Sequence, residues 1–284
     1  MNWSKRPVHW EDDDHHYFSF VFTWDLWDWA RGSQPELDGK QTVIGGPAVR
    51  LHPEWAPDWV TIGPDQPALY RHNPLATRTS MGCIRRCPFC AVPKTEGDLL
   101  ELVKWPVRPI VIDNNLLACS QSHFDEVIDK LKHLDWCDFN QGLDARLLTN
   151  YHALRLAELQ DPKIRLAFDA INYEQSFMDA FNRLRKAGIP KRSIHVYVLI
   201  GFDDSPEDAL YRLRLVRSLG IKPNPMRYQQ LDARRRNDCV APGWTHEELM
   251  RYMSYWSNLR YTAAVPFKEY VHHGRRIDES QISY

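Results

Sequence analysis

Between residues 76 and 232 the chain alternates short apolar runs with amphipathic segments of helical period. The run Ile110-Val111-Ile112 is typical of a buried strand. The segment after it repeats apolar residues at helical spacing, and Ser120 and Ser122 favour the start of a helix there. This alternation predicts an α/β protein with a parallel sheet. Further strands are predicted at 137–139, 164–168, 194–200 and 226–228.

Several predicted helices have clear ends. Ser205 and Pro206 favour a helix start, whereas Gly188 and Gly220 stand where helices would close with a left-handed residue. With a first strand at 76–79, the chain provides about six βα repeats before residue 232. At 284 residues, 43% of them hydrophobic, it is long enough to bury a substantial core.

The predicted organisation has three parts: an N-terminal α/β element at 1–75, a core at 76–232 and a helical C-terminal extension at 233–284. In the N-terminal element, strands are predicted at 17–24 and 42–49. In the C-terminal extension, Thr245 and Glu248 form a capping box. It opens a helix whose apolar stripe runs from Leu249 to Leu259.

Three cysteines, Cys83, Cys87 and Cys90, stand in one short segment. Thiolates bind iron–sulfur clusters or zinc, and either site ordinarily has four protein ligands, whereas the nearby sequence supplies three. One metal position is therefore left for a substrate or cofactor. A zinc site would need a fourth ligand such as His72 or His123, and neither has a familiar zinc spacing. A disulfide is disfavoured because we expect reduced thiols.

The spacing CxxxCxxC, with Phe89 just before the last cysteine, resembles the signature of the radical S-adenosylmethionine (SAM) superfamily. The resemblance implies a partial (β/α)6 barrel and a four-iron four-sulfur cluster held by Cys83, Cys87 and Cys90, with SAM chelating the remaining iron. In that family an electron from the reduced cluster splits SAM, and the 5′-deoxyadenosyl radical abstracts a substrate hydrogen. Phe89 would lie near the adenine. The electron would come from a low-potential donor such as flavodoxin or ferredoxin.

Polar residues follow several predicted strands, at the edge where parallel α/β sheets bind ligands. The family binds the methionine amino group of SAM after its second strand, often with Gly-Gly-Glu; here Asp113 and Asn115 stand in that place. The resemblance further implies that Asp169 binds the ribose, that Arg146 binds the carboxylate and that Gly201 approaches the adenosine. The same residues can instead cap helices or close turns. The candidate cofactor-binding residues are Phe89, Asp113, Asn115, Gln141, Asp144, Arg146, Asp169 and Gly201.

The segment from Val43-Ile44-Gly45-Gly46-Pro47 to Trp59-Val60-Thr61-Ile62-Gly63 is similar to the end of the cobalamin-binding domain that precedes some radical enzymes. It lacks the Asp-x-His-x-x-Gly motif whose histidine would ligate cobalt. The part before the core also falls short of the ~100–150 residues typical of a domain. We therefore expect a reduced relic or lid that binds no cobalamin.

The other cysteines, Cys119, Cys137 and Cys239, are scattered along the chain, whereas an auxiliary cluster needs three or four thiolates together. Their spacing disfavours peptide-modifying relatives, which have cysteine-rich C-terminal extensions. It also disfavours methylthiotransferases, which carry three further cluster cysteines.

The formal net charge of -1 argues against a uniformly basic surface for nucleic acid. Two local groups, Arg234-Arg235-Arg236 and His272-His273-Gly274-Arg275-Arg276, are candidates for phosphate contacts. No apolar run is long enough to span a bilayer. The N-terminus leads from Met1-Asn2-Trp3 into acidic residues at 11–14 without the apolar core of a signal peptide. We therefore expect a cytoplasmic protein with no membrane partner.

The leading hypothesis is a radical SAM enzyme that cleaves SAM reductively and breaks a substrate carbon–hydrogen bond. Two alternatives from other classes stay open: an iron–sulfur electron-transfer protein and a zinc-stabilised binding module. The substrate is open as well. A nucleoside or nucleic acid would use aromatic and arginine-rich edges, whereas a small metabolite would use a narrower polar pocket.

Overall fold

The computed structural model describes residues 3–4, 7–32, 39–63 and 68–272. Residues 273–276 of the second basic group lie outside these ranges. By its internal contacts the chain forms two compact units. The first unit comprises residues 1–123 and 229–238, and the second comprises residues 124–228 and 239–284. The three-part division at residues 75 and 232 stays a prediction.

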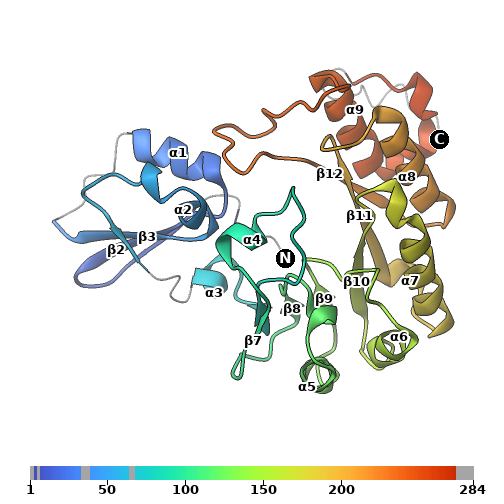
Figure 1. Cartoon of the computed structure of the whole chain (residues 1–284), viewed down its shortest axis with the longest axis horizontal. Helices are drawn as coiled ribbons and strands as arrows, with labels where there is room; N and C mark the ends of the chain where they lie inside the picture. The colour runs from blue at the N-terminus through green and yellow to red at the C-terminus, as the bar shows by residue number, and fades with distance from the viewer. Residues whose placement is uncertain (1–2, 5–6, 33–38, 64–67, 273–284) are drawn as a thin grey trace. The chain divides into compact units, whose positions relative to one another are not determined.

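The first unit contains a four-stranded sheet in the order β1-β2-β3-β4, in which only β1 and β2 are antiparallel. Helix α1 follows β2, and helix α2 follows β3 (Figure 1). The buried core of this part consists of Phe18, Phe20, Leu26, Ile44, Ala48 and Val49. Its elements are β1 (Val8–Glu11), β2 (His15–Ser19), α1 (Thr23–Arg31), β3 (Gln41–Gly45), α2 (Pro47–Leu51), η1 (Pro53–Trp55) and β4 (Thr61–Ile62).

The two strands predicted in this part are shorter than expected, because helices begin soon after each of them. The first strand ends at Ser19 and the second at Gly45. Gly46 has a φ of 100°, and a Cβ there would lie 2.4 Å from the carbonyl oxygen of Phe20. Glycine therefore permits a sharp turn, and Pro47 then occupies the start of α2.

The rest of the first unit surrounds the three-cysteine segment. β5 pairs in parallel with β8, and β6 pairs antiparallel with β7. The cysteines lie in the loop between β6 and α4. These elements are α3 (Ala68–His72), β5 (Ala76–Thr77), β6 (Ser80–Met81), α4 (Val92–Thr95), β7 (Leu100–Glu101), β8 (Ile110–Val111) and η2 (Leu116–Ala118). Helix α5 (Gln121–Leu131) crosses the boundary at residue 123.

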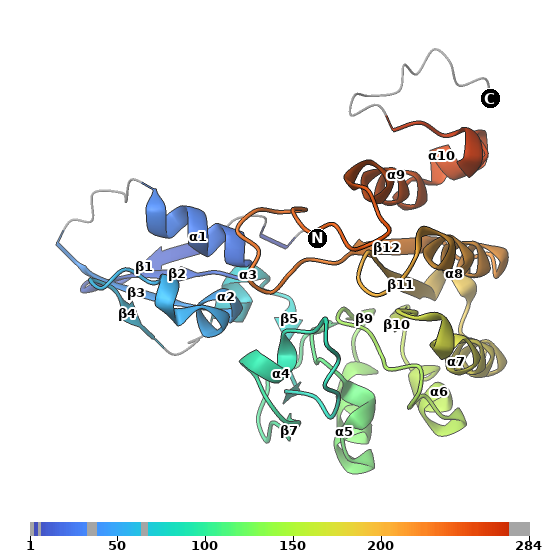
Figure 2. The same ribbon diagram turned by 45° about the horizontal axis from the view of Figure 1, so that its top comes forward.

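In the second unit, four parallel strands lie in the order β12-β11-β10-β9. Helices α7 and α8 run beside β10 and β11, as Figures 1 and 2 both show. The elements are β9 (Cys137–Phe139), α6 (Asn150–Leu156), β10 (Pro162–Ala167), η3 (Ile171–Tyr173), α7 (Glu174–Lys186), η4 (Lys191–Ser193), β11 (Ile194–Ile200), α8 (Pro206–Ser218) and β12 (Pro223–Arg227).

The strand predicted at 226–228 starts earlier and includes two prolines, Pro223 and Pro225. β12 stands at the end of the strand order and pairs with β11 alone. An edge strand tolerates proline because one side of its backbone has no ladder partner.

The local helix signals are confirmed. Gly188 and Gly220 have φ angles of 93° and 78° after α7 and α8, and Ser205 caps α8 with Pro206 in its first turn. Thr245 and Glu248 form the capping box of α9 (His246–Ser257). The prediction that the apolar stripe of this helix reaches Leu259 was wrong. Asn258 has an extended backbone and caps a separate helix, α10 (Leu259–Ala264), where Leu259 is 51% exposed.

Parallel strands followed by helices confirm the predicted α/β class. The partial barrel stays a prediction. Within the described ranges, no helix combines the length and apolar character needed to cross a membrane.

Candidate functional site

The loop that carries Cys83, Cys87 and Cys90 follows a position that requires glycine. Gly82 has a φ of 68°, and a Cβ there would lie 1.9 Å from the carbonyl oxygen of Asp98, so no other residue fits without movement of the backbone. Cys83 is buried, Cys87 and Cys90 are partly exposed, and all three are free thiols.

The three thiols lie within electrostatic reach of one another. Burial raises the pKa of Cys90, and the nearby groups Cys87, Cys83 and Glu96 raise it further. These three cysteines are chemically suitable ligands for an iron–sulfur cluster, because such clusters bind thiolates. Among the residues that the structure describes, however, no three His, Cys, Asp or Glu side chains are gathered as a metal-binding group. The loop supplies suitable donors without presenting them as a preformed ligand set.

Glu96 holds the start of this loop. Its carboxylate accepts hydrogen bonds from the backbone N–H of Gly82 at 2.9 Å and from Asn114 Nδ2 at 2.7 Å. Arg78 Nη1 lies 2.9 Å from the other carboxylate oxygen, and the Glu96 side chain is 6% exposed. A buried carboxylate is stable only when it is paired and hydrogen-bonded, and Glu96 has both kinds of partner.

Asp113 holds the strand that leads into the loop. Its carboxylate accepts hydrogen bonds from the Thr79 backbone N–H at 2.7 Å, from the Thr79 hydroxyl and from the Ser80 hydroxyl at 2.8 Å. Burial raises the pKa of Asp113, and these hydrogen bonds oppose that shift. His123 Nε2 lies 3.1 Å from Thr79 Oγ1. Since the Thr79 hydroxyl gives its proton to Asp113, the His123 ring nitrogen is the donor in that contact.

Three consecutive residues that follow β8, at 113–115, all contact the surroundings of the cysteine loop. Asp113 binds Thr79 and Ser80, Asn114 binds Glu96, and Asn115 Nδ2 lies 3.6 Å from Cys83 Sγ. The assignment of Asp113 and Asn115 to the SAM amino group stays a prediction. Their observed contacts give both residues a role in ordering the loop.

In the second unit, three candidate residues after β9 and β10 lie together. Arg146 donates to both oxygens of Asp144, at 2.7 and 3.1 Å, and its guanidinium lies 4.6 Å from the centre of the Tyr173 ring. Burial raises the pKa of Asp169 to about 6, and the positive charges of Arg212 and Arg146 oppose the shift. This combination of a desolvated carboxylate and a nearby guanidinium is typical of a ligand site.

Gly201 lies beside a buried ion pair that the sequence did not predict. The Gly201 N–H donates to Asp204 Oδ1 at 2.8 Å, and the other Asp204 oxygen accepts from Arg212. Arg212 is fully buried and also donates to the carbonyl oxygens of Phe168 and Leu199, at 2.9 and 2.8 Å. It thus joins the ends of β10 and β11 to α8. Ala209, Leu213 and Val216 share its buried face of the helix, which was the available sequence signal.

A second group of polar side chains, which the sequence analysis did not predict, lies across β9, β10 and β11. Arg165 donates to both carboxylate oxygens of Asp138, at 2.7 and 2.6 Å, and to the Tyr197 hydroxyl at 2.7 Å. Arg165 and Tyr197 occupy strand positions that face away from Ile164 and Val196.

The two remaining candidates, Phe89 and Gln141, lie in turns. Phe89 is partly exposed, between Cys87 and Cys90, and Gln141 is exposed in the turn after β9. Their assignment to the cofactor stays a prediction.

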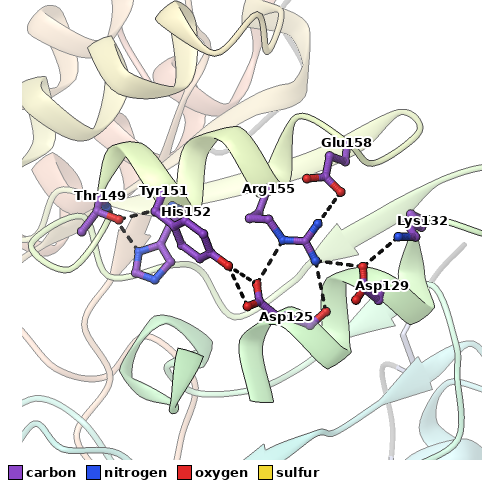
Figure 3. Close-up of polar contacts among 8 residues, drawn as sticks. All are labelled: Asp125, Asp129, Lys132, Thr149, Tyr151, His152, Arg155 and Glu158. Carbon is purple, nitrogen blue, oxygen red and sulfur yellow. Dashed lines mark hydrogen bonds and ion pairs between the residues drawn. The ribbon is translucent and has the colours of Figure 1, made fainter. Parts of the chain in front are cut away.

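A network of surface ion pairs and hydrogen bonds lies elsewhere, between α5 and α6 (Figure 3). Arg155 contacts Asp125, Asp129 and Glu158, and Tyr151 donates to Asp125 at 2.6 Å. Hydrogen bonds from Lys132 and Arg155 lower the pKa of Asp129 to about 2. The acidic groups are therefore paired within the network, which stabilises the packing of two helices.

Comparison of the chain with protein-family models and with curated proteins found no match.

Proposed function

We propose that this chain is a radical SAM enzyme whose cluster would be held by Cys83, Cys87 and Cys90. The main support for this proposal is that three thiols share a loop whose entry is held by two buried carboxylates: Glu96 binds Gly82, and Asp113 binds Thr79. A structural zinc site is filled by four protein ligands. Three cysteine ligands leave one metal coordination position open, which suits a cluster that binds SAM.

When bound, the cluster would supply an electron for reductive cleavage of SAM. The protein's own residues would hold the cofactor in place. Arg146 offers a guanidinium for the SAM carboxylate, and Asp169 offers an acceptor for the ribose hydroxyls. Asn115 would donate to the Cys83 sulfur, which tunes the electron density on that ligand. Cobalamin has no place in the proposal, and the electron donor would be of the flavodoxin or ferredoxin class.

Anaerobic purification followed by metal analysis and a SAM cleavage assay tests the proposal. We expect about four iron and four sulfide per chain, with 5′-deoxyadenosine formed on reduction. Iron and sulfide without SAM cleavage would favour an electron-transfer protein, and zinc in their place would favour a binding module. Either result would overturn the proposal.

Cysteine variants give the matched comparison. Cys83→Ala, Cys87→Ala and Cys90→Ala are each expected to lose the electron paramagnetic resonance signal of the reduced cluster while circular dichroism shows a retained fold. Cys119→Ala serves as the control, because burial raises the pKa of that thiol to about 11 and keeps it protonated. A full signal in all three loop variants would remove these residues as ligands.

A further inference from the structure

Helix α1 presents two different faces within the first unit. Leu26 is fully buried, and Trp29 packs at ring distances of 5.1 and 5.2 Å against core residues Phe18 and Phe20. Trp24, Trp27 and Arg31 recur at spacings of three and four residues on another face, where Arg31 is exposed and both tryptophans are partly exposed. This face is the centre of what we call the tryptophan–arginine surface. It comprises Phe22, Trp24, Trp27, Arg31, Trp55, Arg234, Arg235 and Arg236.

Planar groups are stacked across this surface. The rings of Phe22 and Trp24 are 4.6 Å apart and nearly parallel, at 9°, and Phe22 is 45% exposed. The Arg31 guanidinium lies 3.5 Å from the centre of the Trp27 ring. Trp27 in turn contacts Trp55 edge to face, with 4.9 Å between ring centres. The surface therefore offers ring and guanidinium planes held in fixed positions.

The loop at 229–238 brings Arg234 onto the same surface, and Arg235 and Arg236 follow it directly in the chain. Thr23 Oγ1 donates to the Ala233 carbonyl oxygen at 2.6 Å, and this hydrogen bond is buried. Gln229 and Asn237 close the base of the loop with two hydrogen bonds, of 3.0 and 2.7 Å. The Arg234 guanidinium lies 4.0 Å from the Trp27 ring centre, and the side chains of 234–236 are exposed. The loop and the Arg234 side chain are thus held in place before any ligand arrives.

Acidic residues are interspersed with these arginines. Asp25 and Asp28 lie on α1, and Arg236 acts on Asp25 by opposing the rise in its pKa that burial causes. Asp232 and Asp238 flank the arginines in the loop. Such mixed charge does not suit duplex DNA or RNA, whose binding depends on many phosphate contacts. It suits a ligand that binds largely through stacking, with few phosphates.

We propose that the tryptophan–arginine surface binds single-stranded nucleic acid. Bases would stack on the exposed Phe22 ring and the partly exposed Trp24 ring, and Arg235 and Arg236 would contact phosphates. Aromatic planes beside arginines are the usual composition of single-strand sites. This inference does not depend on the cluster chemistry proposed above.

Fluorescence anisotropy with the purified full chain tests the inference. The probes are fluorescein-labelled ten-nucleotide oligouridylate and oligothymidylate, and a labelled duplex of the same length. We expect saturable binding of the single strands, weaker binding of the duplex, and a log–log salt slope of about -1.4 for two phosphates. No saturable binding of either single strand, or equal affinity for the duplex, would overturn the inference.

Two variants locate the site. Trp24→Leu is expected to weaken single-strand binding at least fivefold, as loss of one stacked base does, and Arg235→Ala to reduce the salt slope by about 0.7. Tyr211→Leu and Arg192→Ala, exposed residues of the second unit, are the controls. Circular dichroism checks that each variant is folded. Wild-type affinity and salt slope in both Trp24→Leu and Arg235→Ala would overturn the assignment to this surface.

Discussion

The carboxylate of Glu96 accepts a hydrogen bond from the backbone N–H of Gly82 at 2.9 Å, fourteen positions earlier in the chain. Gly82 immediately precedes Cys83, so a buried charge fixes the entry to the three-cysteine loop. Arg78 balances the charge of Glu96 from the strand side. The order of this loop is therefore a property of the protein chain itself and can be measured without any metal.

Replacement of Glu96 should loosen the loop. Glu96→Ala leaves buried partners without an acceptor, which costs about 1–3 kcal/mol. We expect faster hydrogen exchange at Gly82 in the metal-free protein, measured by mass spectrometry of the peptide that covers the loop. Glu96→Gln, which keeps an acceptor oxygen, should show a smaller change. Glu158→Gln on the surface is the control. Unchanged exchange in Glu96→Ala would contradict the role of Glu96 in ordering the loop.

Asn115 should tune the cluster if one is bound. Its amide donates to Cys83 Sγ at 3.6 Å, and hydrogen bonds to ligand sulfur favour the reduced cluster. Asn115→Leu is therefore expected to lower the reduction potential with the iron content unchanged, as followed by a redox titration with electron paramagnetic resonance detection. A reduction potential equal to that of the wild type would show that Asn115 does not tune the cluster.

The ion pair of Arg212 and Asp204 should be essential for stability. Arg212→Leu leaves the Asp204 charge buried and unpaired, which we expect to cost about 3–5 kcal/mol in the free energy of unfolding. Urea denaturation measures this loss. Arg214→Leu, on the exposed side of the same helix, should change stability by less than about 0.5 kcal/mol. Similar values for the two variants would show that the pair contributes little.

Asp169 should make stability depend on pH. Its folded-state pKa is raised from 3.8 to about 6, so the folded protein binds the proton more tightly than the unfolded chain. Stability then falls as pH rises from about 4 to 6, and the full cost remains above pH 6. Asp169→Asn should gain stability relative to the wild type over that window, as measured by thermal unfolding from pH 4 to pH 8. A difference that does not vary with pH would refute the shift.

The same residue and Arg146 should matter for SAM. If the proposed function is correct, Arg146→Ala and Asp169→Ala each lose a charge-assisted hydrogen bond, worth roughly 1.5–3 kcal/mol or about one to two decades of affinity. Isothermal titration calorimetry with the reconstituted protein measures the change. The exposed Arg192→Ala is the control, and a variant that binds as the wild type does would exclude its residue from the site.

Features that depend on neighbouring residues were accessible from the sequence. The left-handed glycines at 188 and 220 and the caps Ser205 and Thr245 were predicted correctly, because a cap is decided by a few adjacent backbone groups. The α/β class followed from the alternation of strand and helix patterns. The three-cysteine segment was also recognised from its spacing, and its role as a cluster site stays a prediction.

Pairings between distant residues were decided only by the tertiary structure. In the sequence Arg212 looks like any arginine of an amphipathic helix, yet it is fully buried against the ends of two strands. Glu96 and Asp113 read as ordinary acidic residues, and only the packed chain shows them holding Gly82 and Thr79. A buried charge must find its partners wherever the fold brings them, so sequence order does not reveal which charges are paired.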